Sequence, residues 1–247
     1  MRYIEKNEVP DFHSRWLAHR HDGNPPLYAN YSYKKQLNEC LRIEQHNVCC
    51  YCQRPIDHFY EPSKGGLGAV KDKGSRNEHL YPESGHPHSI ERQVDYSNLF
   101  ACCVDSMGHR EYERHLRYCD VAKENSLIPE LMTEPDCESY FRYTLEGEII
   151  PNGELMSWDE YDRYDGSLPD KLDEARCCIR VLNLNCVTLK ADRVQCITSF
   201  VKFAGNKTID ELTDLKAKWL AAPSYPAYIS LLLQLLDKRI AFLSTKS

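Results

Sequence analysis

The stretch RNEHLYPES, residues 76–84, sets a carboxylate directly beside an imidazole: Glu78 precedes His79, and Pro82 follows after two more residues. A carboxylate can bind a divalent cation, and an imidazole with its ordinary pKa of about 6.5 can take a proton from water at neutral pH. Neighbouring side chains on a strand point to opposite faces. We therefore expect Glu78 and His79 to serve one site only where a strand bends or ends, and the proline favours such an end.

Cysteines flank this stretch on both sides. Cys49 and Cys52 form a C-x₂-C pair, which places two thiols on one tight turn within reach of one tetrahedral ion. Cys103 and Cys119 are the best candidates to close the site, because the 15 residues between them are polar enough to form an excursion from the metal. A C-x₂-C pair with downstream cysteines in a reducing compartment is typical of metal binding. We predict a structural Zn²⁺ held by these four thiolates.

Alternatives to this ligand set remain open. Cys50 and Cys102 each stand beside a predicted ligand, so the true set could be displaced by one residue at either place. The thiols could also be buried structural groups that bind no metal. Four further cysteines lack the close paired spacing of a ligand set and are predicted to be small core residues. They are Cys177, Cys178, Cys186 and Cys196.

Composition limits the classes of protein to consider. The chain has 247 residues, 42% of them apolar, and a net charge of -6, with no apolar run near the roughly 18 residues that a membrane span needs. It begins MRYIEKNEVP, which lacks the apolar segment of a secretory signal, so we expect a soluble cytoplasmic protein whose 12 cysteines stay reduced. Its Lys and Arg density is too low to bind a polyanion tightly. If the substrate is nucleic acid, a partner must supply part of the positive surface.

The pattern along the chain predicts a mainly helical α+β protein in four segments. They are an N-terminal arm with a lead-in helix (1–47), a core that carries the candidate chemistry (48–125), an acidic hairpin region (126–168) and a helical C-terminal region (169–247). The acidic region has eleven acidic and two basic residues. Such a charge run is usually a solvated face. The alternative is that this segment, or an apolar helix face at 230–243, docks on a partner with a basic surface.

Local signals support these segments. Residues 30–47 place apolar side chains such as Leu37 at helical spacing and lead into the first cysteine pair. Residues 61–75, rich in glycine and lysine, predict a loop. In the acidic region, SYFRYTLEGEIIPNG predicts a β-hairpin that turns at Glu146 and Gly147.

The C-terminal region carries a helix-start signal and an apolar stripe. Thr208 and Glu211 have the T-x-x-E spacing of a capping box. Apolar side chains recur at helical spacing near the end of the chain, and we expect them to line one face of a terminal helix. They are Leu232, Leu235, Leu236, Ile240 and Leu243.

In chain order the motifs read C-x₂-C, Glu-His-x-x-Pro, Asn-Leu, Cys and Cys-Asp-x-x-Lys. This order resembles the motif of the HNH nucleases, and the resemblance implies a zinc-stapled ββα-metal core. It implies that His79 is the general base, that Asn98 orients His79, and that Glu78 and Asp120 bind the catalytic metal. Lys123 would contact the substrate. Since both metal ligands are hard oxygen donors, we expect Mg²⁺ or Mn²⁺.

Three of these assignments have alternatives. The family most often has histidine where this chain has Asp120, so His115 or His109 could complete the metal site instead. Asn98 could cap a helix that begins just after it. Lys123 could be a charge on a helix surface.

The resemblance extends beyond the motif. The segments MRYIEK, LRIEQHNVCCYCQRPI, DCESYFRYTLEGEIIPN and LNLNCVTLKADR together resemble the PtuB-like HNH family, the nuclease subunit of Septu-type anti-phage defence. This resemblance implies an endonuclease that cleaves DNA or RNA beside a PtuA-type ABC-like ATPase, in some operons with a retron reverse transcriptase and its DNA. The chain has no G-x-x-x-x-G-K-[ST] motif, so a nucleotide would bind the partner. The alternatives are a zinc-binding adaptor without catalysis and a stand-alone restriction-type HNH nuclease.

Overall fold

The computed structural model describes residues 1–19, 21, 23–60, 73–104, 111–153, 168 and 170–246. Within these residues the fold is mixed α+β, with helices outweighing two small sheets. The helices are α1 (Asp11–Ala18), α2 (Lys34–Glu44), α3 (Ser89–Arg92), α4 (Asp120–Lys123), α5 (Lys171–Val181), α6 (Val187–Ala204), α7 (Ile209–Leu220) and α8 (Ile229–Ser244). The strands are β1 (His58–Phe59), β2 (Gly74–His79), β3 (Leu99–Cys103), β4 (Phe141–Tyr143) and β5 (Ile149–Pro151).

The first sheet has the strand order β1-β2-β3. Strand β1 runs parallel to β2, and β2 runs antiparallel to β3 with Glu78 opposite Phe100 and His79 opposite Leu99. Strand β2 ends at His79, as expected if the adjacent Glu78 and His79 serve one site. Gly74, which the sequence placed in a loop at 61–75, begins this strand, and residues 61–72 of that loop lie outside the described residues.

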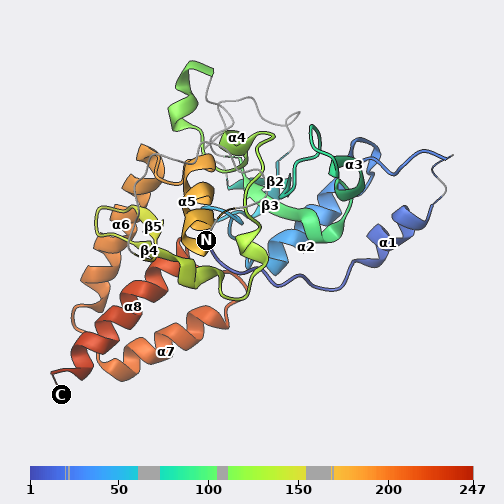
Figure 1. Cartoon of the computed structure of the whole chain (residues 1–247). Helices are drawn as coiled ribbons and strands as arrows, with labels where there is room; N and C mark the ends of the chain where they lie inside the picture. Colours follow the sequence, from blue (N-terminus) through green and yellow to red (C-terminus); the bar gives the residue numbers. More distant parts are fainter. Residues whose placement is uncertain are drawn as a thin grey trace.

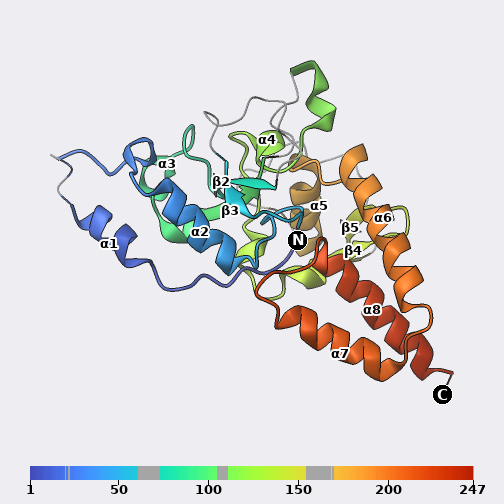
Figure 2. The ribbon, with the colours of Figure 1, turned by 180° about the vertical axis from the view of Figure 1, so that it is seen from behind.

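Figures 1 and 2 show α1 at one end of the molecule, α6, α7 and α8 at the other, and β2 and β3 between them. Helix α2 packs against β2 and β3. Leu37 and Leu41 of α2 are fully buried, which confirms the predicted helix, although it begins at Lys34 and not at residue 30. The C-terminal helices are attached to the turn after α2, where Tyr225 stacks on His46.

A continuous hydrophobic core crosses all four predicted segments. It includes Met1 at the N-terminus, Phe100 of β3, Phe141 of β4 and Leu189 of α6. A second cluster joins α6, α7 and α8, and Leu232 and Leu236 of the predicted apolar stripe are buried in it. The sequence therefore predicted the inward face of α8 correctly.

Two turn and cap predictions are confirmed. The β4–β5 hairpin closes through a hydrogen bond from the Thr144 N–H to the Glu148 carbonyl, and Gly147 has a φ of +77°. Thr208 and Glu211 form the predicted capping box at the start of α7. The rest of the acidic region, residues 154–167, lies outside the described residues.

In the described part of the chain, no helix combines the length and apolar character that crossing a membrane requires.

The turn at Gly147 provides a test of the packing between the hairpin and α6. A Cβ at this position would lie 2.4 Å from the Lys190 carbonyl oxygen, and L side chains rarely adopt its backbone conformation. We predict that Gly147→Ala lowers the free energy of unfolding by about 2–4 kcal/mol, measured by urea denaturation. Gly85→Ala is the matched control, because Gly85 has a φ of +86° but nothing within 4 Å of its Cβ position. Equal losses in the two variants would show that the hairpin does not pack closely on α6.

Candidate functional site

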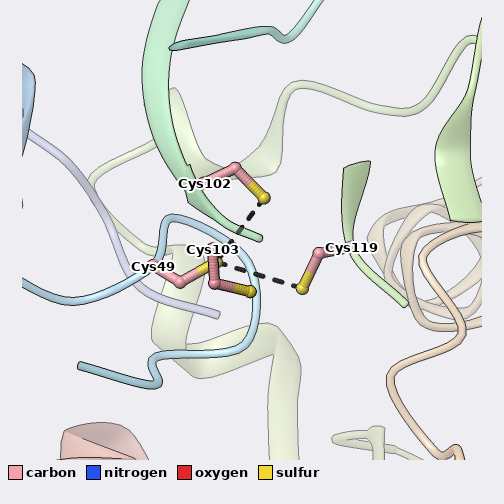
Figure 3. Close-up of side chains that lie close together, drawn as sticks. All are labelled: Cys49, Cys102, Cys103 and Cys119. Atoms are coloured by element: carbon pink, nitrogen blue, oxygen red, sulfur yellow. Dashed lines mark hydrogen bonds between the residues drawn. The ribbon is translucent and has the colours of Figure 1, made fainter. Parts of the chain in front are cut away.

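Four buried thiols from three distant segments meet beside the end of β3. The Sγ atoms of Cys49, Cys102, Cys103 and Cys119 all lie within 4.8 Å of one another (Figure 3). Within the described residues, it is the one group of three or more His, Cys, Asp or Glu side chains that lie closely enough to share an ion. The Cys49 sulfur lies 3.7 Å from that of Cys102 and 3.9 Å from that of Cys119. A tetrahedral zinc ion with Zn–S bonds of about 2.3 Å requires sulfur–sulfur edges of about 3.8 Å. The cluster can therefore bind a metal such as zinc.

The described cluster differs from the predicted ligand set in one member. It contains Cys102 where the sequence indicated Cys52, whose sulfur lies 3.7 Å from that of Cys103. Strand β3 ends at Cys103, so the two adjacent cysteines both reach the cluster and the alternation of a regular strand does not separate them. The described cluster and the predicted set thus share three thiols and differ in the fourth.

The turn that carries Cys49 and Cys52 has the conformation of a metal-binding knuckle. The Gln53 N–H donates to the Cys49 carbonyl, and the Cys49 N–H donates to the Arg54 carbonyl. Gln53 lies in the left-handed region with a φ of +64°. Its side chain also bonds Ser230 at the start of α8, which attaches the knuckle to the C-terminal helices.

The cluster favours thiolate at Cys49. Burial opposes ionisation of this thiol, but hydrogen bonding with Cys102, Cys103 and Cys119 outweighs burial, and the pKa of Cys49 lies well below its ordinary value. Thiolate is the form that binds metal. The neighbouring thiol of Cys50 has a raised pKa because of its burial.

A cavity of about 280 Å³ opens along the second half of β2, from Arg76 to His79. Its wall comes from η1 (Tyr28–Asn30), β2, the loop after β2, and α4. Glu78 and His79 both line it, although they are neighbours on one strand, because the strand ends there. Asp120 and Lys123 line it from α4. Four of the predicted site residues are thus brought to one pocket.

The hydrogen bonds of His79 fix its tautomer. Nε2 lies 2.8 Å from the backbone carbonyl oxygen of Gln93, and because a carbonyl can only accept, Nε2 carries the proton. In the neutral ring Nδ1 then has the free lone pair, and it lies 3.9 Å from the Glu83 carboxylate, which also lines the pocket. Burial lowers the pKa of His79 below its ordinary value, so the ring is neutral at pH 7.

Asn98, which was expected to orient His79, makes no hydrogen bond to it among the described residues. Its side chain accepts from the Tyr81 N–H at 2.6 Å and donates to the carbonyls of Tyr81 and Arg92 at 3.0 Å. It therefore closes the loop that presents the Gln93 carbonyl to His79. The alternative of a helix cap is wrong, because strand β3 follows Asn98.

Glu78 and Lys123 form a buried ion pair. Lys123 Nζ lies 3.0 Å from Glu78 Oε1 and donates to the His79 carbonyl at 2.8 Å, and Tyr51 Oη donates to the same carboxylate at 2.8 Å. Lys123 is only 1% exposed, so it is not a helix surface charge. Its ammonium group holds α4 against β2, and a role in contacting substrate stays a prediction.

Asp120 begins α4 and is paired with Arg76 of β2. Its carboxylate lies against the guanidinium group as an ion pair, although Oδ2 accepts no hydrogen bond. Of the two alternatives to Asp120, His115 is exposed and does not line the pocket, and His109 lies outside the described residues.

Sequence reasoning missed three contributors to the pocket. Tyr28 packs edge-on against the His79 ring, with ring centroids 4.6 Å apart, and burial raises its pKa to about 12. Gln93 supplies the carbonyl for His79, and Glu83 lies beside its free nitrogen. The sequence could have indicated Glu83, because it lies only four residues after His79. It gave no indication of Tyr28, which is distant from His79 in sequence.

A scan against models of known protein families finds no match to this chain, and a search of curated proteins finds none either.

Substitution of single thiols identifies the metal ligands. We predict that Cys49→Ser, Cys103→Ser and Cys119→Ser lose bound zinc and unfold, since structural zinc supplies folding free energy. Zinc content after purification, measured by mass spectrometry with the melting temperature, checks this. Soluble variants that retain one zinc per chain would show that these thiols are not ligands.

A separate pair of variants identifies the fourth metal ligand. Cys52→Ser and Cys102→Ser remove the two thiols in which the alternative sets differ. We expect one of them to lose zinc and the other to retain it. Cys196→Ser, in a half-buried thiol of α6, is the control for cysteine loss elsewhere.

Proposed function

We propose that this protein is a metal-dependent HNH endonuclease that hydrolyses phosphodiester bonds. The observation that carries the proposal is the geometry of His79: its Nε2 proton is bonded to a backbone carbonyl, and its free nitrogen lies beside a pocket that Glu78 and Asp120 also line. A neutral imidazole held in this way can accept a proton from water. The order of β2, β3 and α4 along the chain supports a ββα core.

The pocket's carboxylates fit a divalent cation of the Mg²⁺ or Mn²⁺ class. Such ions are often held by one or two carboxylates together with substrate phosphate and water. Glu78 and Asp120 supply hard oxygen donors from β2 and α4, and each is balanced by one basic side chain. A bound ion would stabilise charge on the phosphate and on the departing oxygen. His79 would take the proton from the attacking water, and Asn98 would keep the loop behind His79 in place.

The proposal includes a partner. The chain has a net charge of -6, so a PtuA-type ATPase with a basic surface would complete the nucleic-acid channel, in some systems together with a retron reverse transcriptase and its DNA. The apolar stripe of α8 is not available for docking, because it packs on α6 and α7. The acidic hairpin region is therefore the proposed docking surface.

A zinc-binding adaptor without catalysis is the second candidate. The ion pairs of Glu78 with Lys123 and of Asp120 with Arg76 favour it, since both proposed metal ligands already have a positive partner. Metal binding at this pocket separates the two candidates.

We predict that His79→Ala lowers the cleavage rate by about 10²–10⁴-fold, the usual effect of losing a general base. The variant should retain its fold and its zinc, because the imidazole lies outside the thiol cluster. Plasmid and total RNA, incubated with the chain and its ATPase partner in millimolar Mg²⁺ or Mn²⁺, provide the assay. His88→Ala, an exposed histidine in the following loop, is the control. Near-wild-type cleavage by His79→Ala contradicts the assignment.

Charge reversal tests the docking surface. We predict that replacing Glu146, Glu148 and Glu154 by lysine weakens co-purification with the ATPase, and that the effect is larger at low salt than at high salt. Glu146 is exposed and Glu148 pairs with Lys190 of α6, whereas Glu154 lies outside the described residues.

A matched control carries the same charge change on another surface. It replaces three exposed glutamates of the N-terminal arm and α2 by lysine: Glu5, Glu8 and Glu39. If both triple variants assemble equally well, the acidic hairpin region is a solvated face and not a docking surface.

A further inference from the structure

The two basic side chains on the described wall of the pocket differ in their freedom to bind a ligand. Lys123 is 1% exposed, and its ammonium group contacts both the Glu78 carboxylate and the His79 carbonyl. Moving it toward a substrate would leave a buried carboxylate without its counter-charge. The Arg76 side chain is 36% exposed, and within the described residues its ion-pair partner is Asp120. Arg76 is therefore the basic group that can turn toward a ligand in the pocket.

Arg76 also has suitable chemistry and position. Its planar guanidinium group can donate two parallel hydrogen bonds to phosphate oxygens. It precedes Glu78 by two residues on β2, so both side chains leave the same face of the strand. The partner it holds, Asp120, is one of the two carboxylates that would bind the catalytic ion.

We infer that Arg76 and a divalent cation are alternative partners of Asp120, and that the released guanidinium group is the phosphate-binding group of the pocket. This inference rests on the proposed function and assigns substrate contact to Arg76 in place of Lys123. It makes the binding of metal and phosphate cooperative, because the ion takes Asp120 and leaves Arg76 for the phosphate. By linkage, phosphate then strengthens metal binding by the same factor.

The inference predicts opposite effects of one substitution on two ligands. In Arg76→Gln, Asp120 loses its competing cation, so Mn²⁺ should bind more tightly without nucleic acid, by about 5-fold or more. Nucleic acid should bind more weakly when Mn²⁺ is saturating, by a similar factor. Without Mn²⁺ the substitution should change nucleic-acid binding little, because Arg76 is then held by Asp120. If Arg76 had a purely structural role, its substitution would weaken the binding of both ligands together.

The experiment uses the full chain. Free Mn²⁺ is measured by electron paramagnetic resonance for wild type, Arg76→Gln and Arg76→Lys, with Arg142→Gln on the exposed face of β4 as the control. Binding of a labelled oligonucleotide is measured in a His79→Ala background, where cleavage does not interfere. Arg76→Lys should keep most of the competition for Asp120 but lose the two-pronged phosphate contact. Melting temperatures confirm that each variant is folded.

The outcomes separate this inference from the proposed function. Tighter Mn²⁺ binding with weaker Mn²⁺-dependent nucleic-acid binding in Arg76→Gln supports it. Unchanged or jointly weakened binding of both ligands overturns it, even if wild type is an active nuclease. If Mn²⁺ binding depends on Arg76 as predicted but wild type with its partner cleaves no nucleic acid, the proposed nuclease function fails alone. Absence of Mn²⁺ binding to wild type overturns both.

Discussion

The convergence of thiols from three segments is the constraint on which the pocket depends. Cys49 follows α2, Cys103 ends β3 and Cys119 precedes α4, so one ion among these sulfurs would fix the relative positions of all three elements. Strand β2 pairs along β3, and α4 is joined to β2 by the Lys123 contacts. The sheet of three short strands has little area of its own to hold this arrangement. An ion bound by the thiols would therefore help to keep the elements that line the pocket in place.

Charge compensation is the second organising feature. Four carboxylates line the described wall of the pocket, from Glu78, Glu83, Asp120 and Glu124, together with two basic side chains. Glu78 is 3% exposed and would be costly to leave unpaired, which explains why Lys123 is buried beside it. Three of these carboxylates have a basic partner: Lys123 for Glu78, Arg76 for Asp120, and Arg114 and Arg117 for Glu124. A divalent cation in the pocket would therefore take the place of one of these partners. An ion that neutralises the carboxylates would in turn allow an anionic substrate to enter.

Local signals predicted more of this protein than distant contacts did. The capping box at Thr208, the turn at Gly147 and the inward face of α8 depend on spacing within one element, and all three were predicted correctly. The gathering of Glu78 and His79 at a strand end also followed from their adjacency. Cysteine spacing identified the cluster but not its fourth thiol, because Cys102 and Cys103 are neighbours at the end of a strand.

The remaining features depend on tertiary contacts that the sequence pattern does not contain. Asn98 was expected to orient the imidazole, but the path of the loop between Tyr81 and Arg92 gives its side chain backbone partners instead. Burial of Lys123 follows from the docking of α4 on β2, and the contact of Tyr28 with His79 joins segments about fifty residues apart. The sequence could have indicated Arg76 as a pocket residue, because it lies two residues before Glu78 and therefore on the same face of the strand.

We propose that this chain binds two metal ions of different chemistry, one held by thiolates and one by carboxylates. A crystal grown with Mn²⁺ and measured at the zinc and manganese absorption edges tests it directly. We expect one zinc peak among the cysteine sulfurs and one manganese peak between Glu78 and Asp120. Zinc at the thiols with no manganese in the pocket at a saturating concentration would contradict the nuclease and favour the adaptor.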